Sequence, residues 1–186
     1  MLSQYIKEHT KESHQALEGI VVRQLKAIRN EEDYASILKN FYSYFMAVER
    51  EIQPYMTGDI LPDYNERRNS QHIQEDIETL GAEVDQNRVV SVPSLHHSLD
   101  ALSALYVLEG SIMGGPYIVQ MLKKYGIERG FSFFSGYREE SAQMWEKFLQ
   151  ALNRVGNDPA TYERSADKAN QTFAHFQELL STPVDR

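Results

Sequence analysis

Cysteine is absent from the 186 residues, which excludes a disulfide framework, a thiolate metal site, an iron–sulfur cluster and a cysteine nucleophile. The 6 prolines and 10 glycines are too few for a collagen-like or disordered chain. Strict alternation of apolar and polar residues is nearly absent as well, which argues against β-strands. Histidine is the one good nitrogen ligand that this composition leaves for a metal.

Positive charge is also scarce. The chain has 19 Lys and Arg against 27 Asp and Glu, a formal net charge of −8 and a pI of about 5.3. A general nucleic-acid binder needs a dominant basic face, so we expect no nucleic-acid partner. The N-terminus lacks the apolar core of a signal peptide, and no run of roughly eighteen apolar residues stands out. We therefore expect a cytoplasmic protein without a membrane segment.

The chain does have enough apolar residues for a core, since 41% of it is hydrophobic and 11% aromatic. Apolar residues recur three and four positions apart, which predicts an all-α fold. Without repeats or linkers, residues 1–186 are predicted to form a single domain. The helices expected from this periodicity lie at about 2–28, 31–55, 66–80, 95–125, 138–155 and 158–180.

Two of these helices have clear start signals. Asn30 is a plausible N-cap for 31–55, and acidic residues follow it near the positive end of the helix dipole. Asp158 followed by Pro159 predicts an N-cap with proline at the first helical position.

The apolar segment 95–125 is interrupted by three glycines and a proline. An interior glycine costs about 1 kcal/mol relative to alanine and an interior proline about 3, so the folded state must compensate. One interpretation is that a bare helix backbone lies over a flat ligand, since Gly110 and Gly114 are four residues apart and share a face. The other is a helix crossing, or two helices joined by a Gly-Gly-Pro turn.

The six histidines form no His-x-x-x-His pair and no repeated Glu-x-x-His pattern, which disfavours a carboxylate-bridged metal site. His14 has the most informative neighbours. Glu18, one turn later, can orient its ring, and Lys7, two turns earlier, can meet an anionic group of a ligand. The alternative is that these three residues form an ordinary solvated helix face.

The segment around His14 and the glycine-interrupted segment together resemble the haem oxygenase family. Residues 7–14, with Ala16 and Glu18, resemble that family's first-helix motif, and residues 106–115 are similar to the distal helix of its bacterial, biliverdin-producing branch. Two further stretches, 41–52 and 158–180, resemble the next helix and the last one. The similarity covers most of the chain in the family's order, and it implies a haem-oxygenase-like bundle with a kinked distal helix.

This resemblance implies a role for each matching residue. His14 would be the proximal ligand of the haem iron, Glu18 would orient its ring and Lys7 would pair with a haem propionate. The catalytic part of the distal pocket would consist of Gly110, Ser111 and Gly114. The pocket floor, where bare backbone meets haem, would be formed by Gly110, Gly114 and Gly115.

In this family haem is both the substrate and the group that activates oxygen, and the products are biliverdin, carbon monoxide and ferrous iron. The electrons must come from outside, because the chain has no Gly-x-Gly-x-x-Gly motif for a nicotinamide or flavin cofactor. The resemblance therefore implies a ferredoxin or flavoprotein reductase as partner. The product could serve iron release, a bilin-binding photoreceptor or haem detoxification.

The chain also departs from the family pattern. Ser111 stands where many relatives carry an aspartate that anchors a proton-delivering water network, and Pro116 follows the glycines where a helix-compatible residue is more usual. Trp145 and Leu149 stand where other family members carry basic residues that bind the haem propionates. The seating of the propionates determines which meso carbon reacts, so that carbon is not predicted. These departures leave open a haem carrier or sensor without turnover, and a haem-free helical protein.

Overall fold

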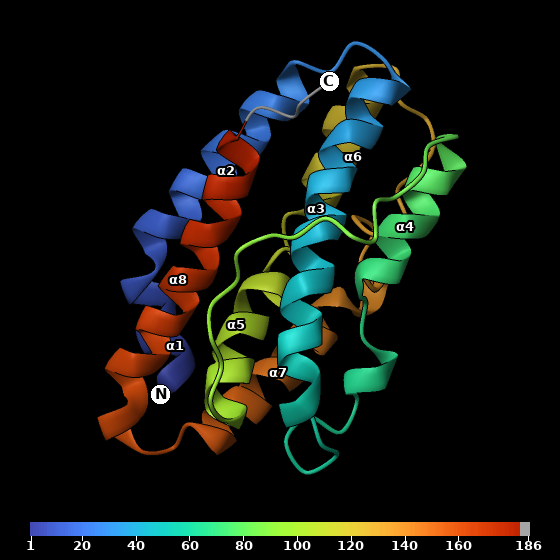
Figure 1. Ribbon diagram of the computed structural model, residues 1–186. Helices are drawn as coiled ribbons and strands as arrows, with labels where there is room; N and C mark the ends of the chain where they lie inside the picture. Colours follow the sequence, from blue (N-terminus) through green and yellow to red (C-terminus); the bar gives the residue numbers. More distant parts are fainter. Residues whose placement is uncertain (183–186) are drawn as a thin grey trace.

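The computed structural model describes residues 1–182, and the predicted all-α class is confirmed. Every regular element in this part of the chain is helical (Figure 1). The expected single domain also includes 183–186, which lie outside the described residues. The α-helices are α1 Leu2–His9, α2 Lys11–Lys26, α3 Glu31–Ile52, α4 Ser70–Thr79, α5 Ser98–Gly110, α6 Gly115–Lys124, α7 Ser141–Val155 and α8 Tyr162–Ser181.

The helix expected over 2–28 is wrong as one continuous element, because it breaks at Thr10 into α1 and α2. Thr10 has φ −111° and ψ 4°, and its buried hydroxyl donates to the Ile6 carbonyl at 2.8 Å. These dihedral angles depart from α-helical values, so α1 ends at His9 and α2 begins at Lys11. Gly19 lies inside α2 without interrupting it.

Three caps fix where helices begin. The Asn30 side chain accepts from the Asp33 amide at the start of α3, which confirms that predicted cap. Asp158 accepts from the Ala160 amide, but it caps the 3-10 turn Pro159–Thr161, and α8 begins only at Tyr162. The helix expected at 66–80 begins only at Ser70, because Asn69 caps α4. The residues before it form a short 3-10 turn and a stretch of loop.

Helix α8 packs against both α2 and α5, and these contacts organise the site. Figure 1 shows α2 and α8 running side by side, while α5 packs on α8, α3 and α7. Helix α3 supplies much of the core, including the fully buried rings of Tyr34 and Tyr44. Helix α2, which carries His14, and helix α5, which ends at Gly110, therefore both pack on α8.

The central apolar helix is broken into α5 and α6 by the turn 111–114. Pro116 lies in the first turn of α6, where a missing amide leaves no hydrogen bond unmade. The whole segment Ser98–Lys124 is long and apolar enough to cross a membrane, contrary to the sequence expectation that no such run exists. Half of its most apolar window is buried inside the protein, as in the core helix of a soluble protein. We therefore take it as part of the core.

Candidate functional site

The segment around His14 is held on α8 by polar contacts. The Ser13 hydroxyl donates to Asn170 Oδ1 at 2.7 Å, and the Gln177 amide donates to the Ser13 carbonyl at 2.8 Å. The imidazole of His14 follows directly and meets the ring of Phe173 edge-on, with 5.9 Å between ring centroids. One ring of α8 therefore supports the predicted ligand from the side.

The side chains of His14, Glu18 and Lys7 are all exposed, so the imidazole is open to a ligand. In the described structure no hydrogen bond joins Glu18 to His14. Lys7 lies on α1 and His14 on α2, with the Thr10 break between them. The sequence predicts these two residues on one face of a continuous helix. They instead lie on two helices that meet at Thr10.

The three glycines of the bend do not all face the same way. A Cβ added to Gly110 would meet only the tip of the Trp145 ring, at 3.7 Å, and one added to Gly114 would approach only the Ser111 carbonyl, at 3.9 Å. A Cβ on Gly115 would lie 1.9 Å from the Phe134 carbonyl oxygen. Gly110 and Gly114 thus leave open space, whereas Gly115 permits close packing of the loop behind the bend.

Two exposed apolar side chains lie in or next to the bend in the chain. Met113 and Tyr117 are large hydrophobic residues with 56% and 63% of their surface exposed, and they flank Gly114 in the chain. Exposed apolar groups gathered at one place are typical of a binding site for an apolar partner. Together with bare backbone and an accessible imidazole, these residues fit an iron porphyrin, which presents a flat apolar face and a nitrogen-binding metal.

The edge of the bend toward α7 is also apolar. The Trp145 ring lies beside Tyr106, with 5.3 Å between centroids, and stacks on Phe148 at 5.5 Å. Leu149, half-buried on the same helix, packs against the core. The two positions that align with propionate-binding cations in the family therefore add hydrophobic surface here.

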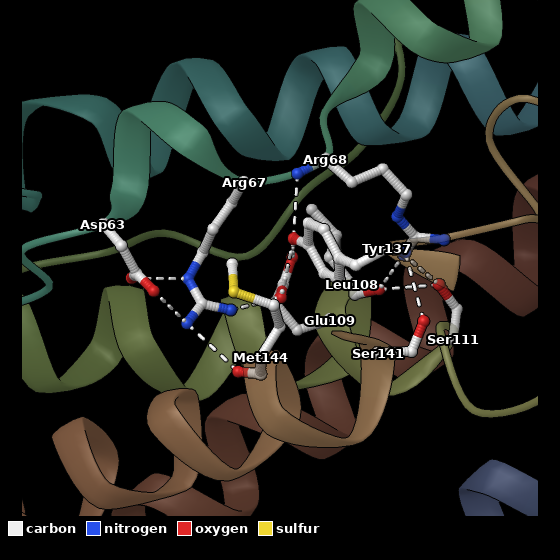
Figure 2. Close-up of polar contacts among 9 residues, drawn as sticks. All are labelled: Asp63, Arg67, Arg68, Leu108, Glu109, Ser111, Tyr137, Ser141 and Met144. Carbon is white, nitrogen blue, oxygen red and sulfur yellow. Dashed lines mark hydrogen bonds and ion pairs between the residues drawn. The ribbon is translucent and has the colours of Figure 1, made fainter. Parts of the chain in front are cut away.

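Behind the bend lies a buried polar network that the sequence analysis did not anticipate (Figure 2). The Arg67 guanidinium donates to Asp63 at 2.9 and 3.0 Å and to the Glu109 carboxylate at 2.6 Å. Glu109 is 1% exposed and also accepts from the Tyr137 hydroxyl at 3.2 Å. A buried carboxylate this well paired stabilises the end of α5.

Arg68 occupies the neighbouring part of the network and reaches the bend itself. Its Nη2 donates to the Ser111 hydroxyl at 2.7 Å and to the Leu108 carbonyl at 3.0 Å, and its Nη1 donates to the Phe133 carbonyl at 3.1 Å. The Ser111 hydroxyl in turn donates to the Leu108 carbonyl at 2.7 Å. The oxygen of Ser111 is therefore engaged by protein groups (Figure 2).

Burial shifts the pKa values of two nearby carboxyl groups upward. Burial raises the pKa of Glu109, and the guanidinium groups of Arg68 and Arg67 oppose that rise. Burial also raises the pKa of Glu49 to about 7, against hydrogen bonds from the Ser70 amide at 2.8 Å and the Ser70 hydroxyl at 2.5 Å. A carboxyl with this pKa exchanges its proton near neutral pH.

Glu49, Glu109 and the two arginines line a cavity of about 360 Å³. It lies between α3, the segment before α4, and α5, and its remaining wall includes Phe45 and Leu108. His14 and the three glycines are not among its lining residues. The cavity therefore belongs to the polar network behind the bend, on a different surface from the imidazole.

One sequence signal could have revealed this network. Glu109 is an acid near the end of an otherwise apolar helix, and such a residue needs a buried cationic partner. Its partner Arg67 lies 42 residues earlier, in the segment predicted as the helix 66–80. Nothing in local spacing connects the two residues.

Comparison with known proteins identifies the family of the chain. The sequence profile of the family described as "Heme oxygenase" matches residues 1–182. A protein named heme oxygenase from Xanthomonas campestris pv. campestris is 28% identical, across 81% of this chain and 90% of its own length. Heme oxygenase 1 from Synechocystis sp. is 26% identical, across 97% of this chain and 83% of its own length.

Solved structures show the same fold. The NO- and CO-bound heme oxygenase from Neisseria meningitidis superposes with a TM-score of 0.81 at 19% identity, covering 100% of this chain and 95% of that one. The haem complex of heme oxygenase-1 from Synechocystis gives a TM-score of 0.75 at 23% identity, covering 96% and 90%. Because the family profile spans nearly the whole chain, the protein belongs to the haem oxygenase family and is a haem oxygenase.

Proposed function

We propose that this enzyme opens the haem ring to biliverdin with release of carbon monoxide and ferrous iron, and that His14 and the 111–114 bend enclose the haem. The observation that carries this proposal is that α2, which holds His14, and α5, which ends at Gly110 and leads into the bend, both pack on α8. Helix α2 presents an accessible imidazole, and the bend presents bare backbone flanked by the exposed side chains of Met113 and Tyr117.

His14 would bind the iron through one nitrogen of a neutral imidazole. Its edge contact with Phe173 and the polar contacts of Ser13 with α8 support a fixed ring position. Glu18, one turn along α2, would accept a hydrogen bond from the other ring nitrogen once the ring is oriented. Lys7, exposed on α1, would pair with a propionate.

Gly110 and Gly114 would form the floor of the distal side, because neither carries a side chain toward the open space. Ser111 would act mainly by fixing the bend, since its hydroxyl already bonds to Arg68 and Leu108. Proton delivery would then rely on backbone amides and ordered water near the glycines. Gly115 would contribute backbone to the pocket while its Cα packs on the 126–137 loop.

When bound, haem would supply both the ring that is opened and the iron at which dioxygen is activated. The electrons would come from a ferredoxin or a flavoprotein reductase. We also propose a cytoplasmic location, with the bilin product passed to a bilin-binding photoreceptor or the iron released for reuse. The apolar α7 edge, with Trp145 and Leu149, would favour a haem orientation that directs propionates elsewhere.

The test is a turnover assay on the purified chain. Hemin is added, and ascorbate or a reductase system then supplies electrons. The proposal predicts that the Soret band bleaches while a bilin absorption band and chelatable ferrous iron appear. Stable bound haem under these conditions would instead indicate a carrier or sensor, and absence of any Soret shift would indicate a chain that does not bind haem.

A further inference from the structure

Arg68 is an unusual buried arginine, because its side chain makes no ion pair in the described structure. It is 7% exposed, whereas its neighbour Arg67 is paired with Asp63 and Glu109. A buried guanidinium without a bonded carboxylate is costly and needs other acceptors. Arg68 finds these acceptors in three oxygens that all lie at or behind the bend.

The three oxygens come from separate parts of the chain. Leu108 offers a carbonyl near the end of α5, Ser111 offers its hydroxyl within the bend, and Phe133 offers a carbonyl in the loop behind it. The end of a helix carries partial negative charge, which favours a cation at Leu108. The guanidinium also lies 4.0 Å from the centre of the Phe133 ring. One side chain thus joins helix, bend and loop.

Two of the backbone hydrogen bonds that hold the bend are long, so contacts from outside the bend matter for its position. Its amides bond to carbonyls three residues earlier, and two of these bonds, Ser111 to Leu108 and Met113 to Gly110, are 3.4 Å long. Bonds of this length contribute little. The hydrogen bonds from Arg68 therefore add to a backbone ladder that is weak at Ser111 and Met113.

Arg68 is itself held in place. Its backbone amide donates to the Tyr137 hydroxyl at 2.8 Å, and that hydroxyl donates to Glu109. Asn69, the next residue, caps α4. The guanidinium therefore reaches the bend from a fixed base.

We propose that Arg68 is a positioning residue that sets the place of the 111–114 bend by holding the Leu108, Ser111 and Phe133 oxygens together. Through the bend it fixes how Gly110 and Gly114 approach the haem, a consequence that rests on the proposed function. Arg68 touches neither haem nor oxygen in this role.

The test compares Arg68→Met with Arg68→Lys. The methionine variant loses every hydrogen-bond donor, and the lysine variant keeps the charge but loses the two separate Nη donors of the guanidinium group. Tyr44→Phe is the matched control, because it loses a buried hydroxyl bond to the Thr172 carbonyl without contacting the bend. Hydrogen–deuterium exchange is measured on the haem-free chain. In Arg68→Met we expect the amides of 111–115 to exchange at least about tenfold faster, with a smaller change in Arg68→Lys. In Tyr44→Phe, the ratio of the exchange rate of the bend amides to that of the core amides should be the same as in wild type.

Unchanged exchange in the bend of Arg68→Met, or an increase spread evenly over the core as in the control, would overturn the proposal. If Arg68→Met does not fold, Ser111→Ala removes one of the three acceptors, and a smaller increase confined to the bend is the supporting result. In haem-loaded protein, the C–O stretch of the carbon monoxide complex should shift in Arg68→Met and not in Tyr44→Phe. Failure of the wild-type chain to bind hemin would defeat the proposed function, while exchange in the haem-free chain would still decide the role of Arg68.

Discussion

At the scale of single residues, the absence of a side chain at Gly110 and Gly114 matters as much as the presence of the His14 imidazole. Both glycines leave space beside the bend, and their neighbours there are a tryptophan ring edge and a backbone carbonyl. A flat ligand can therefore approach the main chain directly. The size of the group at position 110 should control access from this side.

Gly110→Leu should weaken hemin binding or turnover by tenfold or more, equivalent to about 1.4 kcal/mol, because its isobutyl group fills the open space and meets Trp145. Gly110→Ala is the matched control, since its methyl group would make only an ordinary contact at 3.7 Å. Hemin titration and the rate of bilin formation measure the effect. Wild-type turnover in the leucine variant would contradict the assignment of this side to the pocket.

Glu49→Gln should change how stability depends on pH. Burial raises the pKa of Glu49 from 4.5 to about 7, so the folded chain binds this proton more tightly than the unfolded chain. The stability contributed by the protonated carboxyl is complete below about 4.5 and is lost as the pH rises through about 7. Glutamine carries no charge, so the variant should gain up to about 3 kcal/mol relative to wild type across that window.

Urea unfolding of both proteins at pH 5 and pH 8 measures this gain. Glutamine can keep accepting from the Ser70 amide, but its amide nitrogen cannot accept from the Ser70 hydroxyl. The change of the stability difference between the two pH values therefore reports the charge, because the lost hydroxyl bond affects both. A stability difference that is the same at both pH values would show that Glu49 keeps an ordinary pKa.

At the scale of elements, the two sides of the bend between α5 and α6 have different surroundings. The open side carries Gly110 and Gly114, while the other side carries Gly115 against the loop that precedes α7. That loop is fixed from α4, because the Asp76 carboxylate accepts from the Ser132 and Phe133 amides at 2.8 Å each. The bend is therefore held on the side of Gly115 by a fixed loop, and it is open on the side of Gly110 and Gly114.

Adjacent glycines provide a matched test of this division. Gly115→Ala should destabilise the fold by about 3 kcal/mol, because the added methyl group would lie 1.9 Å from a backbone oxygen that cannot rotate away. Gly114→Ala should change stability by less than about 1 kcal/mol, because Gly114 has helical dihedral angles and free space beside it. Denaturant unfolding measures both. Equal stability of the two variants would mean that the loop does not pack on Gly115 as described.

Local sequence signals predicted much of the fold. The apolar periodicity gave the helical class, and Asn30 marked the true start of α3 because capping depends on neighbouring amides, whereas Asp158 caps the 3-10 turn before α8. The break at Thr10 was not predicted, since neither a glycine nor a proline marks it in the sequence. The late start of α4 at Ser70 was missed for a different reason, because Arg67 and Arg68 are drawn into the core by partners distant in sequence.

The candidate site divides in the same way. His14 and the glycine bend are contiguous motifs, so their family resemblance was visible in the sequence. Arg68 meets Ser111 across 43 residues, and Glu109 meets Tyr137 across 28, so only the tertiary structure brings them together. Residues that hold the bend were missed because they act from outside it.

At the scale of the whole molecule, haem binding would join α2 to the bend across α8. These elements have few direct contacts with each other in the described structure, since α2 packs mainly on α8. A ligand that binds both should stabilise the fold. At a free hemin concentration of about 100 times Kd the gain is about 2.7 kcal/mol, which corresponds to a Tm rise of roughly 5–10 °C for a chain of this size.

Differential scanning calorimetry with and without hemin measures this rise, and His14→Ala should reduce it strongly. Since His14 is exposed, the variant should keep the Tm of the haem-free wild type within about 1 °C. An equal hemin-induced rise of Tm in both proteins would show that hemin binds elsewhere on the protein and not through His14.

The central claim is that the His14 imidazole binds the iron of a haem covered by the glycine bend, and absorption titration with hemin tests it most directly. Wild type should give an intense, shifted Soret band at one equivalent of hemin. His14→Ala should lose that band and regain it when free imidazole is added, because the small ligand replaces the missing side chain. A Soret band in His14→Ala that matches the wild type without imidazole would contradict the claim.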